Sequence, residues 1–406
     1  MHSGNILILT NWSYKDALIQ SYTLPYVMMI RDVLDPSKKI IVRTLEQKKY
    51  NATTDEKIAI RREFKEKNIQ WVSSRYSQNS LKALFYYLVD LARLVFLCYK
   101  YKIKIIHIWC TPPAIIAYPL SLITGAEIVL DSYEPHAESM VENGAWTRES
   151  LKFKLLFWFE KAVSRKAKVV ISATSGMKDY AQNKYGVLFD NFYVKPACVN
   201  IDQFSFKDKK KNELLERFGL QNKIVGLYAG KFGGIYLERE FFDLAKEFVN
   251  FYGDNFRMLI LTSHSRKEIE ERCKACGLDH ENIISMFVPH KAISEYMGLA
   301  DFAITPVKPV PSKRYCTPIK NGEYWALGLP VVITPNISDD SDIILENDIG
   351  VVLEGFNEEE YRKVVREIDR LLKQYTMKEL YDKIRYIAIR YRSLEIAEEI
   401  YKQNYN

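Results

Sequence analysis

The stretch Thr317-Pro-Ile-Lys-Asn-Gly-Glu-Tyr-Trp-Ala-Leu-Gly-Leu-Pro-Val-Val-Ile333 carries three structural signals in succession. A proline-containing loop ends at Pro318, and the apolar spacing after it predicts a helix from about Ile319 to Leu327. Gly328 is typical of the residue just past a helix end. The run Pro330–Thr334 is β-rich and predicts a strand. A loop, a helix and a strand in this order indicate an α/β domain.

The start of this predicted helix has the chemistry of a nucleotide-diphosphate site. Free backbone N–H groups and the positive end of the helix dipole lie at a helix N-terminus, and both favour a bound phosphate. Lys320 adds a full charge in the first turn, and Glu323 follows one turn later near it on the helix surface. Because a carboxylate can accept two hydrogen bonds from a vicinal diol, Glu323 is suited to bind a ribose.

Length and charge indicate two domains, one of them facing an anionic partner. A chain of 406 residues is long for one core. Residues 1–200 hold 28 Lys and Arg against 18 Asp and Glu, whereas residues 201–406 hold 30 against 33. The first half therefore favours phospholipid headgroups or a pyrophosphate-linked acceptor. We expect no nucleic-acid partner, because no dense basic run and no nucleic-acid motif is present.

The sequence predicts neither a signal peptide nor a transmembrane helix. The most apolar run, Leu81–Tyr99, is interrupted by Lys82, Asp90 and Arg93. The favoured interpretation is a helix packed on a sheet, and the alternative is a helix that also touches a membrane surface. We expect a cytoplasmic protein, with peripheral attachment to the inner membrane face left open. Cys273-Lys-Ala-Cys276 has no second ligand pair, so no metal site is predicted.

Short β-rich runs alternate with helical patterns along both halves, which predicts parallel sheets covered by helices. The predicted strands are Ile6–Thr10, Lys39–Arg43, Ile103–Trp109, Glu127–Asp131, Ala167–Ser172, Phe192–Val194, Ile224–Ala229, Arg257–Thr262, Ile283–Phe287, Phe302–Thr305, Pro330–Thr334 and Gly350–Leu353. The predicted fold is two Rossmann-like, doubly wound α/β domains that face each other across a cleft. The boundary is expected at Lys195–Phe204, which gives domains 1–200 and 201–387.

Four segments together resemble the GT-B glycosyltransferases, particularly the retaining family 4 type and its relatives. The opening stretch is similar to the nucleotide-sugar motif of that group. The others are Lys195-Pro-Ala-Cys-Val-Asn-Ile-Asp-Gln-Phe204, Tyr228-Ala-Gly-Lys-Phe-Gly-Gly234 and Tyr391-Arg-Ser-Leu-Glu-Ile-Ala-Glu-Glu-Ile-Tyr401. The last resembles the closing helix that crosses back to the first domain, so the resemblance assigns residues from about 388 to 406 to that domain.

The resemblance implies a donor site in the second half. The diphosphate would be held by Lys231 and Lys320 with Gly230, Gly233 and the backbone near Thr317 and Pro318, and the ribose by Glu323. No metal or other cofactor is implied, and UDP or GDP is the expected nucleotide. Two family positions differ, because Tyr315 stands where a Glu is frequent and Tyr236 where a Lys is frequent. Lys320 or Arg314 is the candidate replacement for that Lys.

The acceptor side is expected after the predicted strand that ends at Asp131. Asp131, Glu134, His136 and Glu138 cluster there, where the ligand crevice of an open α/β sheet lies. The resemblance makes His136 the candidate next to the reacting sugar, with the three carboxylates as alternative bases. In retaining enzymes of this kind the acceptor proton can pass to the departing phosphate instead, which leaves these residues to position substrates. His264, His290 and Val288 are candidates for the edge of the nucleotide base.

These features predict a glycosyltransferase that moves a sugar from a nucleotide-diphosphate donor to an acceptor hydroxyl with retention. The acceptor would be a saccharide or a lipid-linked molecule, in the synthesis of a cell-surface polysaccharide or a glycolipid. One alternative is a GT-B nucleotide-sugar epimerase or hydrolase, which needs no acceptor. The other is a non-catalytic nucleotide-binding scaffold.

Overall fold

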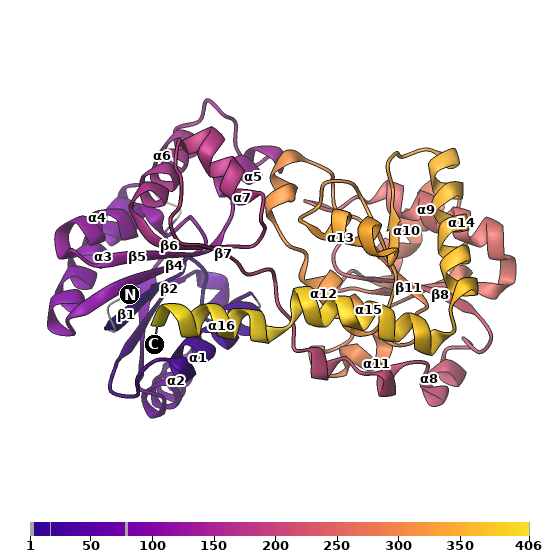
Figure 1. Ribbon diagram of the computed structural model, residues 1–406, viewed down its shortest axis with the longest axis horizontal. Coiled ribbons are helices and arrows are strands. Elements are labelled where there is room, and N and C mark those ends of the chain that lie inside the picture. Colours follow the sequence, from indigo (N-terminus) through magenta and orange to yellow (C-terminus); the bar gives the residue numbers. More distant parts are fainter. Residues whose placement is uncertain (1–3, 17, 78–79, 406) are drawn as a thin grey trace. The chain divides into compact units, whose positions relative to one another are not determined.

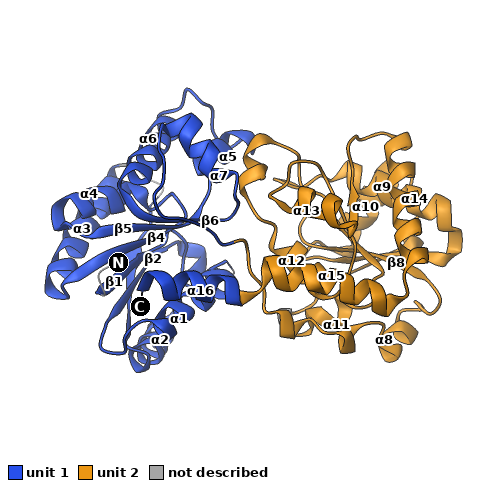
Figure 2. Cartoon of the chain, viewed as in Figure 1, with its two compact units in different colours: residues 1–195, 395–406 blue, residues 196–394 orange. Residues whose placement is uncertain are grey.

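The computed structural model describes residues 4–16, 18–77 and 80–405. The chain divides into two compact units, residues 1–195 with 395–406 and residues 196–394 (Figure 2). Each unit has its own parallel sheet with helices on both faces (Figure 1). The prediction of two doubly wound α/β domains is therefore confirmed.

Unit 1 is built on a parallel sheet with the strand order β3-β2-β1-β4-β5-β6-β7. The strands are β1 (Asn5–Leu9), β2 (Ile40–Glu46), β3 (Ile69–Arg75), β4 (Ile103–Trp109), β5 (Glu127–Tyr133), β6 (Ala167–Ser172) and β7 (Phe192–Val194). The central strands are apolar along almost their whole length, because helices cover both faces of the sheet.

The helices of unit 1 form two layers (Figure 1). They are α1 (Leu24–Val33), α2 (Thr54–Glu66), α3 (Ser80–Lys100), α4 (Ala114–Thr124), α5 (His136–Glu142), α6 (Leu151–Lys166), α7 (Met177–Tyr180) and α16 (Leu394–Tyr405). On one face, α4 packs against both α3 and α6. On the other, α1 meets α16, with the rings of Tyr26 and Tyr401 6.2 Å apart. Within the described residues, no helix is both long and apolar enough to cross a membrane.

Unit 2 has a parallel sheet with the strand order β10-β9-β8-β11-β12-β13. Its strands are β8 (Ile224–Ala229), β9 (Phe256–Leu261), β10 (Ile283–Met286), β11 (Phe302–Thr305), β12 (Val331–Ile333) and β13 (Gly350–Val352). Its helices are α8 (Asn212–Arg217), α9 (Arg239–Tyr252), α10 (Arg266–Cys276), α11 (Ile293–Met297), α12 (Ile319–Ala326), α13 (Asp340–Asn347), α14 (Glu358–Gln374) and α15 (Met377–Arg392). One core lies under α11, α12, α13 and α15, and the other under α9, α10 and α14.

The segment from Thr317 to Ile333 folds as predicted, into α12 and β12. Gly328 ends the helix with a φ of +65°, and a Cβ atom there would lie 2.4 Å from the Cα atom of Tyr381. Only glycine satisfies both the backbone angle and the close approach of α15. The sequence did not predict the strand β3 or the helices α2, α5, α8, α13 and α15, and these elements leave the fold class unchanged.

In each sheet the strand order reverses at one point. The reversal lies between β1 and β4 in unit 1, and between β8 and β11 in unit 2. The loops leaving the carboxyl ends of two such strands run in opposite directions, which opens a crevice at that edge of the sheet. The predicted donor residues follow strands at this edge of unit 2.

Candidate active site

A glycine-rich turn leaves β8 at the reversal point of unit 2. Gly230 is closely packed, because a Cβ atom there would lie 2.8 Å from the hydroxyl oxygen of Tyr228. Gly233 and Gly234 follow with φ values of +82° and +62°, which favour glycine. The Tyr228 hydroxyl donates a hydrogen bond to the carbonyl of Lys231, and the Lys231 side chain is exposed. A cation is thus held on a tightly shaped turn beside the crevice.

His264 fixes this turn from the neighbouring strand end. Its Nε2 accepts a hydrogen bond of 3.1 Å from the backbone N–H of Phe232, and its Nδ1 lies 3.2 Å from the Glu268 carboxylate. These partners assign the ring proton to Nδ1. Both ring nitrogens of His264 therefore have protein partners, and through Nε2 the side chain contacts the glycine turn.

The chain after the turn is bonded to the loop that follows β11. The N–H of Leu237 donates to the carbonyl of Pro306 at 2.7 Å, and the N–H of Lys308 donates to the carbonyl of Ile235 at 2.9 Å. Tyr236 lies between these bonds in an antiparallel bridge with Val307. The glycine turn and the loop that leads to α12 are therefore joined side by side, as their places in the sheet order require.

An ion pair joins the first and second turns of α12. The Nζ atom of Lys320 lies 3.3 Å from Oε2 of Glu323, and the exposed fractions of the two side chains are 34% and 6%. Thr317, just before the helix, lies with its hydroxyl 3.3 Å from that of Ser338. A partly exposed pair of this kind adds little stability, about 0–1 kcal/mol, so a ligand can rearrange it at low cost.

A buried polar network supports α12 from below. Asn321 accepts a hydrogen bond from Thr305 at 2.5 Å and donates one to Asp340 at 2.6 Å. Asp340 also pairs with Arg392, whose side chain is buried beside the ring of Trp325. Burial raises the pKa of Asp340, and Arg392 and Asn321 oppose that rise. This network fixes the helix start relative to β11, and the sequence prediction did not include it.

The remaining candidates of unit 2 lie at the same edge or near it. Val288 follows β10 and packs partly buried against the core. His290 begins a short 3-10 turn after it, but its side chain lies outside the described residues. Arg314 binds Asp342 at 2.8 Å and the carbonyl of Ser338 at 2.8 Å, so it is held on α13. Of the two candidate replacement cations, only Lys320 lies in the first turn of α12.

In unit 1 the structure separates Asp131 from the other acceptor-side candidates. Asp131 is fully buried, and its carboxylate lies 3.1 Å from Nζ of Lys195 and 2.6 Å from the hydroxyl of Tyr401. Nε2 of His107 lies 3.3 Å away, and its Nδ1 lies 2.5 Å from the hydroxyl of Tyr405. Burial alone would raise the pKa of Asp131, but Lys195 and His107 outweigh it and hold that pKa well below its usual range.

Lys195 is itself enclosed by aromatic rings. Its Nζ atom lies 3.8 Å from the ring centre of Tyr26 and 4.9 Å from that of Trp109. A buried ammonium that contacts both π faces and a carboxylate is a structural centre, since it links β5, β7, α1 and α16 in one cluster.

His136 and Glu134 lie together at the start of α5. Nδ1 of His136 is 3.3 Å from the Glu134 carboxylate, and about a quarter of each side chain is exposed. Glu138 points elsewhere, because it is nearly buried and makes two contacts of 2.6 and 2.8 Å with Arg148. His136 thus begins a helix rather than lying in a loop, and of the four candidates it forms an accessible pair with Glu134.

Glu160 of α6 is a buried carboxyl that the sequence prediction missed. It accepts hydrogen bonds from Thr111 at 2.7 Å, from the backbone N–H of Ala137 at 3.1 Å and from Tyr185 at 3.0 Å. Burial raises the pKa of Glu160 to about 7, although these donors and His136 oppose the rise. The available signal was its position on the apolar face of α6, between Leu156 and Val163.

Known proteins resemble this chain in part of its sequence and in its fold. Residues 240–390 match the family described as Glycosyl transferases group 1. Comparison with curated proteins gives no match. Among solved structures, the chain is similar to a glycosyltransferase from Rickettsia africae ESF-5, with a TM-score of 0.71, 17% identity and 99% coverage of both chains.

Two further neighbours also span the whole chain. HepE of Anabaena, solved in complex with UDP, has a TM-score of 0.69 and 14% identity over 98% of this chain and 99% of its own. WaaG, described as a glycosyltransferase involved in lipopolysaccharide biosynthesis, has a TM-score of 0.65 and 16% identity over 98% of each chain. The family match covers part of unit 2, and the three neighbours share the two-domain fold of this chain. The chain thus has the GT-B fold of glycosyltransferases, and residues 240–390 carry the match to group 1 of these enzymes.

Proposed function

We propose that the chain transfers a sugar from a nucleotide-diphosphate donor to an acceptor hydroxyl. The observation that carries this proposal is the Lys320–Glu323 pair at the start of α12. The same helix contacts the end of β8, just before the turn of Lys231, because the Tyr324 hydroxyl accepts a hydrogen bond of 2.9 Å from the N–H of Ala229. Without ligand the Lys320 and Glu323 side chains neutralise each other. A bound nucleotide would replace this ion pair by two new contacts. The Lys320 ammonium would bind phosphate oxygens, and the Glu323 carboxylate would accept hydrogen bonds from the ribose hydroxyls.

Charge stabilisation of the leaving diphosphate is the proposed chemical role of unit 2. Negative charge grows on the diphosphate as the bond to the sugar breaks. Lys231, Lys320 and the free N–H groups at the start of α12 stabilise that charge more strongly in the transition state than in the ground state. The proposal needs no metal ion for this role. Retention follows the resemblance to the family 4 type, with the acceptor proton passing to the departing phosphate.

On the acceptor side, we assign the reacting sugar and acceptor to the neighbourhood of His136 and Glu134. Both are partly exposed, so either can contact a substrate. Glu138 is turned to Arg148 and is assigned a structural role, as is the fully buried Asp131. These assignments narrow the four candidates to the pair that solvent can reach.

The proposed donor is a UDP sugar, with a GDP sugar as the second choice. The UDP complex of HepE, a protein of the same fold, supports this order. We propose a saccharide or lipid-linked acceptor in cell-surface polysaccharide or glycolipid synthesis, at a cytoplasmic location. The described role of WaaG in lipopolysaccharide biosynthesis and the basic first half of the chain support that class of acceptor.

Ligand-induced stabilisation tests the donor site. A ligand that binds only the folded protein at a hundred times its Kd stabilises it by about 2.7 kcal/mol. We expect UDP or GDP, and the matching sugar nucleotide, to raise the melting temperature by a few degrees, whereas CMP has no effect. Lys320→Ala and Glu323→Ala should each weaken affinity by roughly ten- to a hundredfold. Wild-type affinity in both variants would refute the site.

The same sugar nucleotide tests the acceptor side. His136→Ala should lower turnover by roughly a hundredfold, because the reacting sugar loses a positioning contact, and leave nucleotide affinity unchanged. His280→Ala, at an exposed histidine of unit 2, is the matched control. A loss of affinity without a loss of turnover would contradict the role of His136. Consumption or epimerisation of the donor in the absence of any acceptor would favour the epimerase or hydrolase alternative.

A further inference from the structure

The outer face of α3 is apolar along its whole length. The exposed large side chains on it are Leu81, Leu84, Phe85, Leu88, Val89, Phe96 and Tyr99. Leu81 is 82% exposed and Phe85 is 62% exposed. The opposite side of the helix already packs on the sheet through Asp90, Leu94 and Cys98. α3 therefore has a second apolar face that the fold of unit 1 leaves in water.

This face continues onto the two helices next to it. The Tyr99 hydroxyl donates a hydrogen bond to the carbonyl of Ile123 at 3.0 Å, which joins α3 to α4. The rings of Tyr118 and Trp158 meet edge to face at 5.6 Å, which joins α4 to α6. The exposed apolar residues of α4 and α6 are Leu122, Ile123, Leu151, Leu155 and Trp158. An apolar patch that spans three helices exceeds the scattered exposed residues of an ordinary surface.

Within segments 80–104 and 151–168, which carry α3 and α6, the exposed charges all have one sign. The basic residues in segments 80–104 and 151–168 are Lys82, Arg93, Lys100, Lys102, Lys104, Lys152, Lys154, Lys161, Arg165, Lys166 and Lys168. The two acidic residues in these segments, Asp90 and Glu160, are buried and bound to Arg43 and to Thr111. The surface thus combines exposed apolar side chains with an excess of positive charge, since Glu149 and Glu127 lie only at its border.

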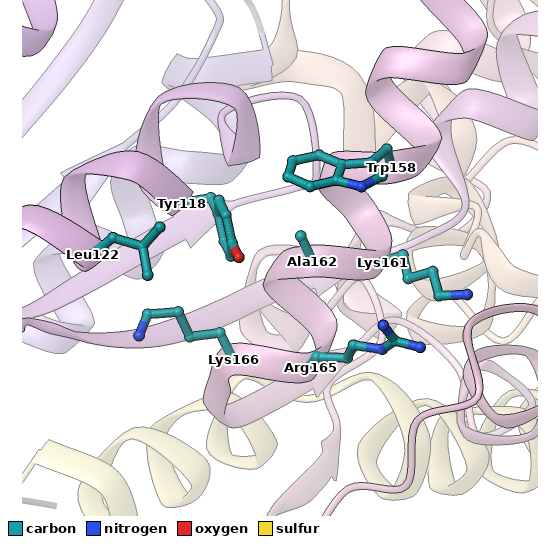
Figure 3. Close-up of a pocket in the computed structure, with 7 residues that line it drawn as sticks. All are labelled: Tyr118, Leu122, Trp158, Lys161, Ala162, Arg165 and Lys166. Carbon is teal, nitrogen blue, oxygen red and sulfur yellow. The ribbon is translucent and has the colours of Figure 1, made fainter.

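A pocket lies within this surface, between α4 and α6. Its volume is about 610 Å³, and its lining combines the aromatic side chains of Tyr118 and Trp158 with Lys161, Arg165 and Lys166 (Figure 3). Aromatic rings with a polar edge and basic side chains are the groups that meet lipid headgroups at a membrane interface. The pocket has the chemistry to receive a lipid phosphate.

We infer that α3, α4 and α6 form a docking face for an anionic membrane, with the pocket between α4 and α6 as a phosphate headgroup site. An amphipathic helix of this composition inserts its apolar side chains at the headgroup boundary, while basic side chains attract anionic lipid. A second copy of the chain is a poor occupant, because two such faces would bring like charges together. This inference concerns unit 1 and does not rest on the proposed sugar transfer.

Co-sedimentation of the full chain with vesicles tests the inference, with no nucleotide present. The protein should sediment with vesicles of phosphatidylcholine and phosphatidylglycerol, remain in solution with phosphatidylcholine alone, and be released as salt rises. Millimolar inorganic phosphate should not release it. Equal binding to both vesicle types, or release by inorganic phosphate, would overturn the inference. So would failure to bind either vesicle type, whether the chain stays monomeric or self-associates.

Two variants separate the apolar and the basic parts of the face. Leu84→Ser with Phe85→Ser and Leu88→Ser removes apolar side chains that are already in water, so folding should be preserved. Lys161→Gln with Arg165→Gln and Lys166→Gln removes the charge of the pocket. Each triple variant should lower vesicle partitioning by roughly ten- to a hundredfold.

Matched changes in unit 2 control for general effects of composition. Leu345→Ser changes an exposed leucine of α13, and Lys267→Gln changes an exposed lysine of α10. Both should bind vesicles as the wild type does. Wild-type binding by both triple variants, at unchanged melting temperature, would show that this face does not dock.

Discussion

The buried carboxyl of Glu160 holds the backbone next to the proposed acceptor site through hydrogen bonds. It holds the N–H of Ala137, the residue after His136, and it joins the start of α5 to the end of β4 through Thr111. Because burial raises the pKa of Glu160 to about 7, the folded protein binds a proton at pH values where the unfolded chain has released it. The stabilising contribution of this group is present below about pH 4.5 and is lost as the pH rises through about 7.

Replacing Glu160 by Gln should remove that pH dependence. The amide keeps the size and hydrogen-bonding capacity of the protonated acid but cannot ionise. The variant should match the wild type near pH 4 and exceed its free energy of unfolding near pH 8 by up to about 3 kcal/mol. Denaturant unfolding of both proteins across this range measures the difference. A difference that stays constant with pH would show that Glu160 does not titrate in the folded protein.

The sequence predicted those site contacts that are local in the chain and not those that depend on distant residues. Lys320 and Glu323 are three positions apart on one helix, so their contact follows from local geometry. Asp131 was recognised as a polar strand end, but its burial depends on Tyr401, which is 270 positions away. A contact over that distance is set by the packing of α16 on unit 1. Residue type alone therefore cannot separate the buried Asp131 from the accessible Glu134.

The turn after β8 is the element on which the proposed position of Lys231 depends. Its backbone is held at Phe232 by Nε2 of His264, so His264 is a positioning residue for the turn. His264→Ala should free the turn and weaken nucleotide affinity several-fold, because an ordered hydrogen bond is worth about 1 kcal/mol. His264→Gln supplies a side-chain oxygen for the Phe232 N–H and should restore part of the affinity.

Calorimetric titration with UDP or GDP measures these changes. His280→Ala, with its exposed side chain, is again the control. A purely structural role would lower the melting temperature without moving the affinity. If His264→Ala gave this result, the turn after β8 would not be part of the nucleotide site.

The elements show why the fold was easier to predict than its details. Strands such as β4 and β6 are mostly apolar and rich in Ile or Val, and they were located to the residue, because both faces of the sheet are covered. The edge strand β3 (Ile69–Arg75) alternates polar and buried residues over a short run and was not predicted. α15 (Met377–Arg392) was also not predicted, although Leu380, Ile384 and Ala388 mark its buried face.

The two halves of the chain carry different surface features and different proposed sites. The first half carries the excess of basic residues and the apolar docking face, and the second half carries the proposed donor site. The C-terminal helix α16 is part of unit 1, where Tyr401 and Tyr405 complete the buried cluster of Asp131. The resemblance to GT-B enzymes implied that the C-terminal helix belongs to the first domain. The buried cluster gives a physical reason, since without α16 Asp131 would lack the hydroxyl of Tyr401 and His107 that of Tyr405.

The central claim is that Glu323 binds the ribose of a nucleoside diphosphate at the start of α12. Calorimetric affinities of UDP and 2′-deoxy-UDP for the wild type and for Glu323→Ala test it most directly. If the carboxylate accepts hydrogen bonds from the ribose hydroxyls, the wild type should lose roughly five- to tenfold in affinity for the deoxy ligand, whereas the variant should hardly distinguish the two. The coupling between the two changes should then be about 1 kcal/mol. An equal loss for the deoxy ligand in both proteins would contradict the claim.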